Sequence, residues 1–141
     1  MGMAAYATKN LEIKGWDDLK SFRVVYYRGR KNIEKKLDKI VPKKYLMLSK
    51  DDLQGFRMVE KGRVDVLVTD SRQGNHILKK NAESLSNVKL VKNFNKARIY
   101  AYMHKKHLKL AEKLAKTLDA MKQDGTFKKL VDQAHNQIDE I

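Results

Sequence analysis

The sequence has no cysteine and a single proline, Pro42. The absence of cysteine excludes disulfide bonds, thiolate catalysis and cysteine-ligated metal sites. One proline argues against long disordered linkers. No apolar run approaches the ~20 residues that a membrane-spanning helix needs. Residues 1–6 lack the charged region and apolar core of a signal peptide, so no signal peptide is expected within this chain.

Acidic residues are few compared with basic ones. There are 17 Asp and Glu against 31 Lys and Arg, which gives a net charge of +14. Such an excess attracts nucleic acid, anionic lipid or an acidic partner. The lysines are scattered rather than gathered in a block, however, which is typical of a surface that keeps a protein soluble. With 42% hydrophobic and 34% charged residues over 141 positions, the composition predicts one globular domain.

The stretch 62–70 organises the predicted fold. Its apolar, β-branched run is typical of a strand buried on both faces. A helix over 50–61 is expected to run into it and to stop at Gly62. Thr69, Asp70 and Ser71 are cap residues that would open the next helix. The pattern therefore predicts a carboxylate just past the carboxyl end of a buried strand, where ligands bind in open α/β sheets.

The other elements are expected to alternate between strand and helix. Strands are predicted at 7–13, 22–27, 44–48, 88–91 and 98–103, with a polar turn at 92–96. Helices are predicted at 15–20, 71–80, 108–121 and from 127 onward, and a turn at 28–32 is expected to lead into a helix that reaches about residue 40. Ser49 is expected to cap the helix over 50–61, with Asp52 as the acidic member of a capping box. The alternation predicts an α/β fold: a mostly parallel mixed sheet of about five strands with helices on both faces, ending in two amphipathic helices.

Two places could bind a ligand. The turn 27–32, between a strand and a helix, offers backbone N–H groups and two cations, which suits an anion or a carboxylate. The same turn is also typical of an ordinary strand-to-helix junction, and it does not match a phosphate loop. Asp70 could likewise serve only as a helix cap. Asp65 is expected to pair with a lysine or a backbone group.

Histidines do not form a convincing metal site. His104 and His107 lie three residues apart with lysines between them and no acidic third ligand. His76 and His135 are isolated in the sequence. No nucleophile has a plausible base near it, and no pair of carboxylates has the spacing of an acid and a base. We therefore expect no enzyme activity, no metal and no cofactor.

Four motifs resemble, in the same order, the second lobe of extracellular solute-binding protein family 3, which has the type 2 periplasmic binding fold. They are an Asp-Leu-Lys helix and strand at 15–24, a glycine turn at 28–34, a strand ending in aspartate at 62–70, and a helix followed by Asp-Gly-Thr at 121–130. The resemblance implies a second-lobe domain at 6–97. It also implies a crossover strand and two C-terminal helices at 98–141, which would normally pack on a first lobe.

The family resemblance also implies a site and a function. The turn would hold a ligand carboxylate and the aspartate a ligand amino group, so the implied ligand-binding residues are Gly29, Arg30, Lys31, Asn32 and Asp70. The implied function is hinge closure around a small polar solute, such as an amino acid or a related anion, in an ABC-type uptake or sensing system. Arg30 and Lys31 stand where amino-acid binders carry Ser or Thr, which favours a more anionic solute. The implied partner is a membrane permease or sensor, and the implied location is periplasmic or extracellular.

Nothing before residue 7 corresponds to the family's first lobe. A complete chain of this kind would bind weakly or not at all, and a fragment or a degenerate reading frame fits equally well. The apolar stripes of the last two helices are then expected to fold back on the sheet or to form a homodimer. Two other functions stay open: a small basic module that binds nucleic acid or an acidic partner, and a structural dimerisation domain. A helix-turn-helix interpretation of the last two helices is disfavoured, because their apolar faces are well formed and neither helix concentrates arginine or asparagine. Nucleic acid is therefore not the expected partner.

Overall fold

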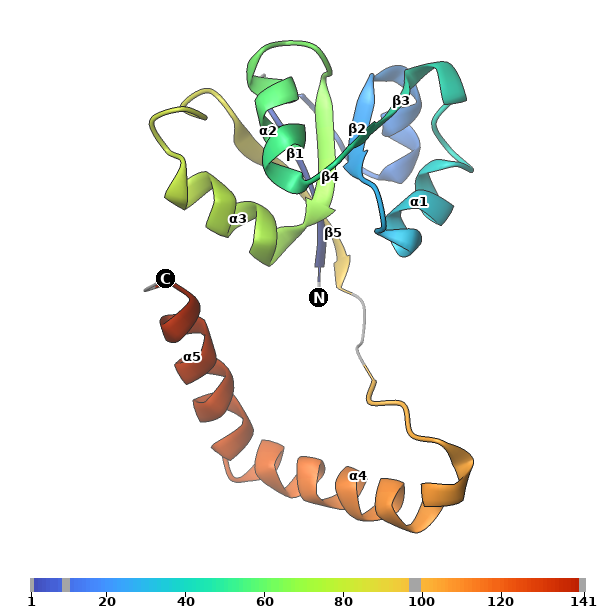
Figure 1. Cartoon of the computed structure of the whole chain (residues 1–141), viewed down its shortest axis with the longest axis vertical. Helices are drawn as coiled ribbons and strands as arrows, with labels where there is room; N and C mark the ends of the chain where they lie inside the picture. The colour runs from blue at the N-terminus through green and yellow to red at the C-terminus, as the bar shows by residue number, and fades with distance from the viewer. Residues whose placement is uncertain (1, 9–10, 97–99, 140–141) are drawn as a thin grey trace. The chain divides into compact units, whose positions relative to one another are not determined.

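The computed structural model describes residues 2–8, 11–96 and 100–139. The chain divides into two compact units, Met1–Arg98 and Ile99–Ile141. The first unit contains the β-sheet with its helices, and the second contains the last two α-helices (Figure 1). Both predicted C-terminal helices are therefore present.

The sheet of the first unit is mixed and has five strands in the order β3-β2-β4-β1-β5. β2 runs parallel to both β3 and β4, whereas β1 runs antiparallel to β4 and to β5. The predicted α/β class and mixed sheet are confirmed. The strands are β1 (Gly2–Ala7), β2 (Val24–Tyr27), β3 (Leu46–Ser49), β4 (Val66–Asp70) and β5 (Lys89–Lys96).

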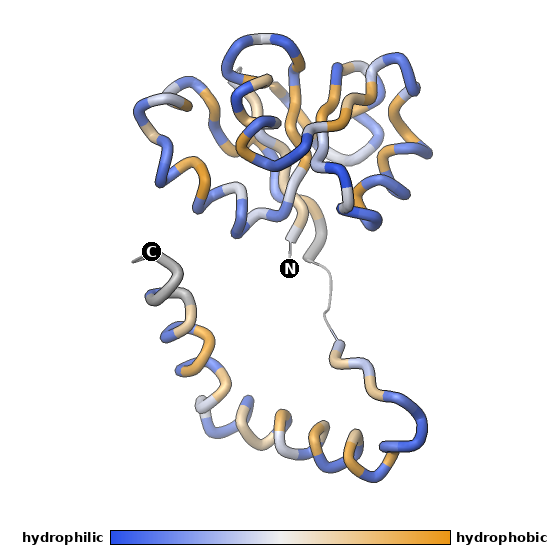
Figure 2. The backbone as a smooth tube through the Cα atoms, in the orientation of Figure 1, coloured by the Kyte–Doolittle hydropathy of each residue, from blue (hydrophilic) through white to orange (hydrophobic). Residues whose placement is uncertain are grey.

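Helices cover both faces of this sheet (Figure 1). One face carries the 3-10 helix η1 (Trp16–Ser21) and α1 (Lys31–Leu37); the other carries α2 (Asp52–Glu60) and α3 (Ser71–Lys80). A further short 3-10 helix, η2 (Lys43–Tyr45), leads into β3. Apolar residues are concentrated along the strands between the two layers (Figure 2).

β4 is the central strand, and all five of its residues are buried. Val66 and Val68 pack into the core beneath α1, whereas Leu67 packs into the core beneath α2 and α3. This alternation follows from the two-residue period of a strand. Gly62, with a φ of +65°, ends the preceding helix in the left-handed conformation that the sequence predicts for it.

The first and last strands differ from the prediction. β1 occupies Gly2–Ala7, so among the described residues of the strand predicted at 7–13 only Ala7 lies in a strand. Residues 8 and 11–13 do not, and residues 9 and 10 lie outside the described residues. The turn predicted at 92–96 is also wrong, because β5 continues to Lys96 beside β1. Residues 100–103 form no strand, and residues 98 and 99 lie outside the described residues. Pairing with β1 accounts for the wrong turn at 92–96, because it satisfies the backbone hydrogen bonds of polar residues that a sequence pattern assigns to a turn.

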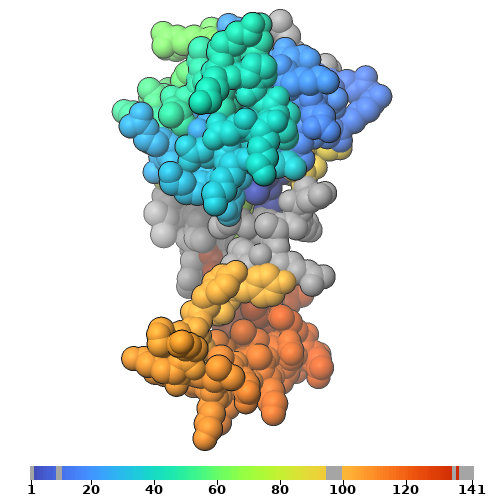
Figure 3. Space-filling model, turned by 90° about the vertical axis from the view of Figure 1, so that its right-hand side faces the viewer, coloured from blue at the N-terminus to red at the C-terminus, as the bar shows by residue number. Residues whose placement is uncertain are grey.

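β3 lies at one edge of the sheet and pairs only with β2 in the described part of the chain. Residues around β3, teal in the colour bar, form the outer surface on that side of the first unit (Figure 3). Met47 and Leu48 are accordingly exposed, because no element of the sheet lies beyond them.

The second unit consists of a 3-10 helix, η3 (Lys105–His107), followed by α4 (Leu108–Gln123) and α5 (Thr126–Asp139). Gly125, with a φ of +82°, joins the two α-helices, and Asp124 Oδ1 accepts a hydrogen bond from the Thr126 amide at 2.8 Å. Polar and apolar residues alternate along both helices (Figure 2). Among the described residues, no helix is long and apolar enough to cross a membrane.

Candidate ligand-binding site

A pocket of about 320 Å³ opens at the carboxyl end of β4. β2 and β4 are parallel neighbours, so the strand-to-helix turns that follow them lie at the same edge of the sheet. β1 is antiparallel to β4, so its amino end reaches the same place. The lining residues are Gly2, Met3, Gly29, Arg30, Lys31, Asn32, Ile33 and Asp70.

All five residues that the sequence predicts as ligand-binding line this one pocket. The structure thus brings Asp70 to the turn at 29–32, although more than thirty residues separate them in the sequence. Their part in binding stays a prediction. Gly2, Met3 and Ile33 line the pocket although the sequence did not indicate them as site residues. The strand that holds Gly2 and Met3 was predicted at a later position.

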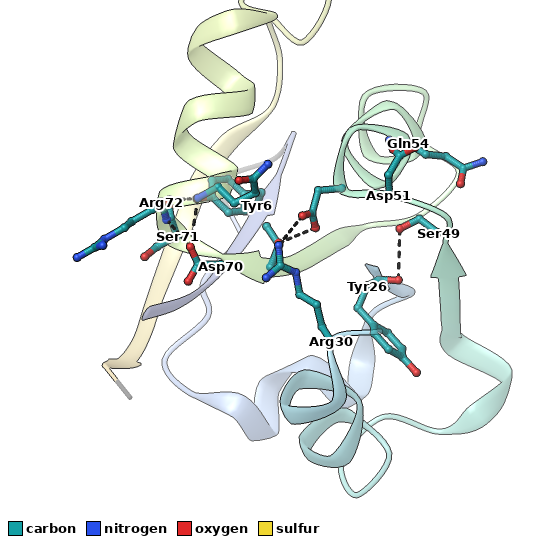
Figure 4. A network of polar contacts seen from close by, with 12 residues as sticks. Tyr6, Tyr26, Arg30, Ser49, Asp51, Gln54, Asp70, Ser71 and Arg72 are labelled. Atoms are coloured by element: carbon teal, nitrogen blue, oxygen red, sulfur yellow. Dashed lines mark hydrogen bonds and ion pairs between the residues drawn. The ribbon is translucent and has the colours of Figure 1, made fainter. Parts of the chain in front are cut away.

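Asp70 caps α3. Its Oδ1 accepts hydrogen bonds from the amides of Arg72 at 3.1 Å and Gln73 at 3.2 Å (Figure 4). The capping role that the sequence left open is therefore present. Capping uses Oδ1 alone, so Asp70 can cap the helix and still present Oδ2 to a ligand in the pocket it lines.

The turn before α1 places backbone groups at the pocket. Gly29 adopts a φ of +105°, which a side chain would disfavour. The amides of Asn32 and Ile33 belong to the first turn of α1 and so have no partner within the helix. Lys31 lies at the surface, where its Nζ is 3.3 Å from Glu34 Oε2.

Arg30 does not offer the free cation that the sequence suggests. Its Nη2 donates to Asp52 Oδ2 at 2.6 Å, and Asp52 Oδ1 accepts from Thr69 Oγ1 at 2.6 Å. Asp52 is only 7% exposed and Thr69 is fully buried. The Arg30 side chain reaches away from α1 toward the sheet (Figure 4). Within the described structure, its buried Nε has no hydrogen-bond partner.

The structure also corrects the predicted cap of α2. Asp51, not Ser49, is the N-cap: its Oδ1 accepts from the Gln54 amide at 2.7 Å, and Gln54 Oε1 accepts from the Lys50 amide at 2.7 Å. Ser49 is buried, and its Oγ donates to the Tyr26 carbonyl at 3.3 Å. The prediction placed the cap two residues early. Two adjacent aspartates at a helix start, of which capping needs one, are the signal that could have identified Asp52.

Tyr6 supports the start of α3 beside the pocket. Its hydroxyl donates to the Ser71 carbonyl at 3.1 Å and lies 2.9 Å from Asn75 Oδ1. Burial, reinforced by the nearby charges of Asp70 and Asp52, raises the pKa of Tyr6 well above its ordinary value. The phenol therefore stays a hydrogen-bond donor at neutral pH.

The remaining candidate residues are not among those that line the pocket. Asp65 accepts from the Arg23 amide at 2.8 Å, so its predicted backbone partner is confirmed, and its Oδ1 lies 2.9 Å from Arg23 Nη2 in an ion pair. His104 accepts from the Lys106 amide at the start of η3. Across residues 2–8, 11–96 and 100–139, no three His, Asp or Glu side chains gather as a metal site.

Comparison with solved structures shows what fold this is. The chain aligns over 94% of its length with an ancestral arginine-binding protein bound to arginine, at 28% identity and a TM-score of 0.66. An ancestral arginine-binding protein bound to glutamine gives 27% identity and a TM-score of 0.63. The resemblance to solute-binding protein family 3 is confirmed. A histidine kinase sensor domain with similarity to periplasmic binding proteins, at 20% identity and a TM-score of 0.66, shares the fold.

These family 3 relatives are longer than this chain, which covers 59% of the arginine-bound structure. An uncharacterized protein of Shewanella oneidensis is 32% identical over 135 residues, which are 94% of this chain and 51% of that protein. The chain thus spans about half the length of the curated relative that it matches. No protein-family model matches the sequence.

Proposed function

We propose that this chain forms part of a solute-binding protein and binds a small polar solute in the pocket at the carboxyl end of β4. The observation that carries the proposal is the convergence of Asp70 and the turn 29–32 on one pocket. The likeness to an ancestral arginine-binding protein supports it, because that likeness extends over nearly the whole chain.

The contacts favour a solute that carries an amino or guanidino group together with a carboxylate. Asp70 Oδ2 would accept from the cationic group. The amides of Asn32 and Ile33 would donate to the carboxylate, with the Asn32 side chain beside them. Because Asp52 neutralises Arg30, the pocket lacks the excess positive charge that would favour a more anionic solute.

Closure and partners belong to the whole protein of which this lobe is a part. In our proposal, a second lobe supplies the opposite wall and closes on the solute by a hinge motion. The assembled protein would serve an ABC-type uptake system or a sensor, outside the cytoplasmic membrane, with a permease or a sensor as its partner. The names of the arginine-binding and sensor-domain neighbours are compatible with either role.

A thermal-shift screen tests the binding. The purified chain is heated with amino acids, polyamines, dicarboxylates or inorganic phosphate, and a ligand at a hundred times its Kd should stabilise the chain by ~2.7 kcal/mol. The critical variant is Asp70→Asn, because asparagine caps a helix as well as aspartate does but cannot pair with a cation. We expect a shift with arginine or a related solute that Asp70→Asn abolishes.

The matched control is Asp51→Asn, which changes the same charge at another helix cap, outside the pocket. It should retain the shift. If no solute stabilises the chain, or if Asp70→Asn binds as well as the unaltered chain, the proposed site is wrong. A short DNA duplex in the same screen tests the basic-module alternative, and a shift with DNA alone that fades with salt would favour it.

A further inference from the structure

We propose that Asp52 sets the charge selectivity of this pocket: by neutralising Arg30, it keeps the pocket from binding small anions such as sulfate or phosphate. This inference deepens the proposed function, because it concerns the same pocket. Asp52 does not line the pocket, so it acts through Arg30 as a positioning residue.

Arg30 is placed where a bound anion would meet it. It lines the pocket, and its side chain remains 24% exposed although its Nη2 is bonded to Asp52. Its guanidinium is also 5.8 Å from the centre of the Tyr27 ring, which limits where the side chain can go. The buried Nε has no hydrogen-bond partner in the described part of the chain, so the guanidinium keeps one donor that Asp52 does not satisfy.

The contacts of Asp52 position it to pair with Arg30. It begins α2, but Asp51 already caps that helix, so helix capping does not account for Asp52. Each of its two oxygens has one partner, Arg30 on Oδ2 and Thr69 on Oδ1. A carboxylate that is 7% exposed is costly to bury unless it is paired and hydrogen-bonded, and these two contacts satisfy it. The pair is therefore neutral as seen from the pocket.

The decisive variant is Asp52→Asn, which removes one negative charge and keeps an oxygen that can accept from Arg30 or Thr69. The Arg30 charge would then be uncompensated and accessible. We expect the affinity for sulfate, measured by isothermal titration calorimetry on the full chain, to rise by about tenfold or more over the unaltered chain. Damage to the structure would lower affinity, so a gain separates a charge effect from a structural one.

Two further variants make the test specific. Asp51→Asn adds the same net charge at the neighbouring residue and should leave sulfate affinity unchanged. The double variant Arg30→Gln with Asp52→Asn removes the cation as well and should lose the gain. No gain in Asp52→Asn, an equal gain in Asp51→Asn, or a gain that survives the loss of Arg30 would each overturn the proposal.

A measurement on the unaltered chain covers the case in which Asp52→Asn does not fold. The Arg30 Nε–H resonance is followed by NMR during titration with sulfate, and we expect it not to move. A saturable shift would show that Arg30 is already available to anions and would overturn the proposal. A failure of the proposed function would give a different result. The unaltered chain would then bind no amino acid or polyamine, whatever the sulfate affinity of Asp52→Asn.

Discussion

The hydroxyl of Tyr6 lies 2.9 Å from Asn75 Oδ1, so the first strand of the sheet is tied to a helix that begins 65 residues later. Gly74 makes this contact possible, because a Cβ at that position would overlap the Tyr6 ring. The ring in turn meets Phe56 edge-on, with centroids 5.0 Å apart. One buried tyrosine thus joins β1, α2 and α3.

Gly74→Ala is expected to destabilise the first unit by about 1–3 kcal/mol, because overlap with the Tyr6 ring forces the packing apart. The loss should exceed the gain in helix propensity that alanine brings. Urea unfolding followed by the fluorescence of Trp16, the sole tryptophan, measures it. Gly15→Ala is the matched control, since a Cβ there meets no atom within 4 Å. Equal stability of the two variants would contradict the packing argument.

Tyr6 should make the stability of the first unit fall in alkaline solution. Its pKa is raised in the folded state, so its contribution is complete below the unfolded value of ~10 and is lost as the pH rises above that value. Tyr6→Phe removes this dependence and should cost about 1 kcal/mol at neutral pH through the lost hydrogen bond. Urea unfolding at pH 7 and above pH 10 compares the two proteins. A steeper alkaline loss in Tyr6→Phe would contradict the assignment.

Asp124 should make the helicity of the second unit depend on acid. The hydrogen bonds from Thr126 lower the pKa of Asp124, so its stabilising contribution is present above the unfolded value of ~4 and is lost as the pH falls through the folded value. Circular dichroism between pH 6 and pH 2 should show a shallower loss in Asp124→Asn, which keeps an acceptor without a charge. Asp119→Asn, which removes the same charge within α4, is the control for net charge, and its loss of helicity should follow that of the unaltered chain.

The exposed apolar side chains of α4 and α5 predict self-association. Leu114 and Leu130 are 37% and 50% exposed. Sedimentation velocity should detect a dimer, and replacing both leucines by serine should weaken it by about tenfold or more. Serine at Lys113 and Lys129, on the same two helices, provides the control. A monomer at all concentrations would mean that another surface covers these leucines.

The elements that the sequence predicted well are those whose own residues determine them. β2 and β4 contain buried, β-branched residues, so their own sequence indicates a strand. In α4 and α5, apolar residues recur with the period of a helix over many residues. β1 contains alanines with little strand preference, and it is a strand because β4 and β5 flank it. Its position depends on tertiary pairing.

The candidate site also has a part that the sequence could predict and a part that it could not. Asp70 and the turn 29–32 could be predicted because each follows a strand, and parallel neighbours bring such turns together. The Arg30–Asp52 pair could not, since its members lie 22 residues apart, Arg30 just before α1 and Asp52 at the start of α2. Which of two adjacent aspartates caps α2 and which turns inward depends on the arginine and threonine that surround the second one.

The antiparallel position of β1 has a consequence for how the first unit folds. Of the five strands, β1 is synthesised first, whereas its two neighbours, β4 and β5, are synthesised last, ending at Lys96. In the described sheet β1 pairs with β4 and β5, and β5 pairs only with β1. β1 therefore stays unpaired until β4 and β5 have been synthesised. Contacts of such large sequence separation slow folding. We therefore expect the sheet to close in one late step after synthesis of the whole unit, with β2, β3 and β4 able to assemble earlier.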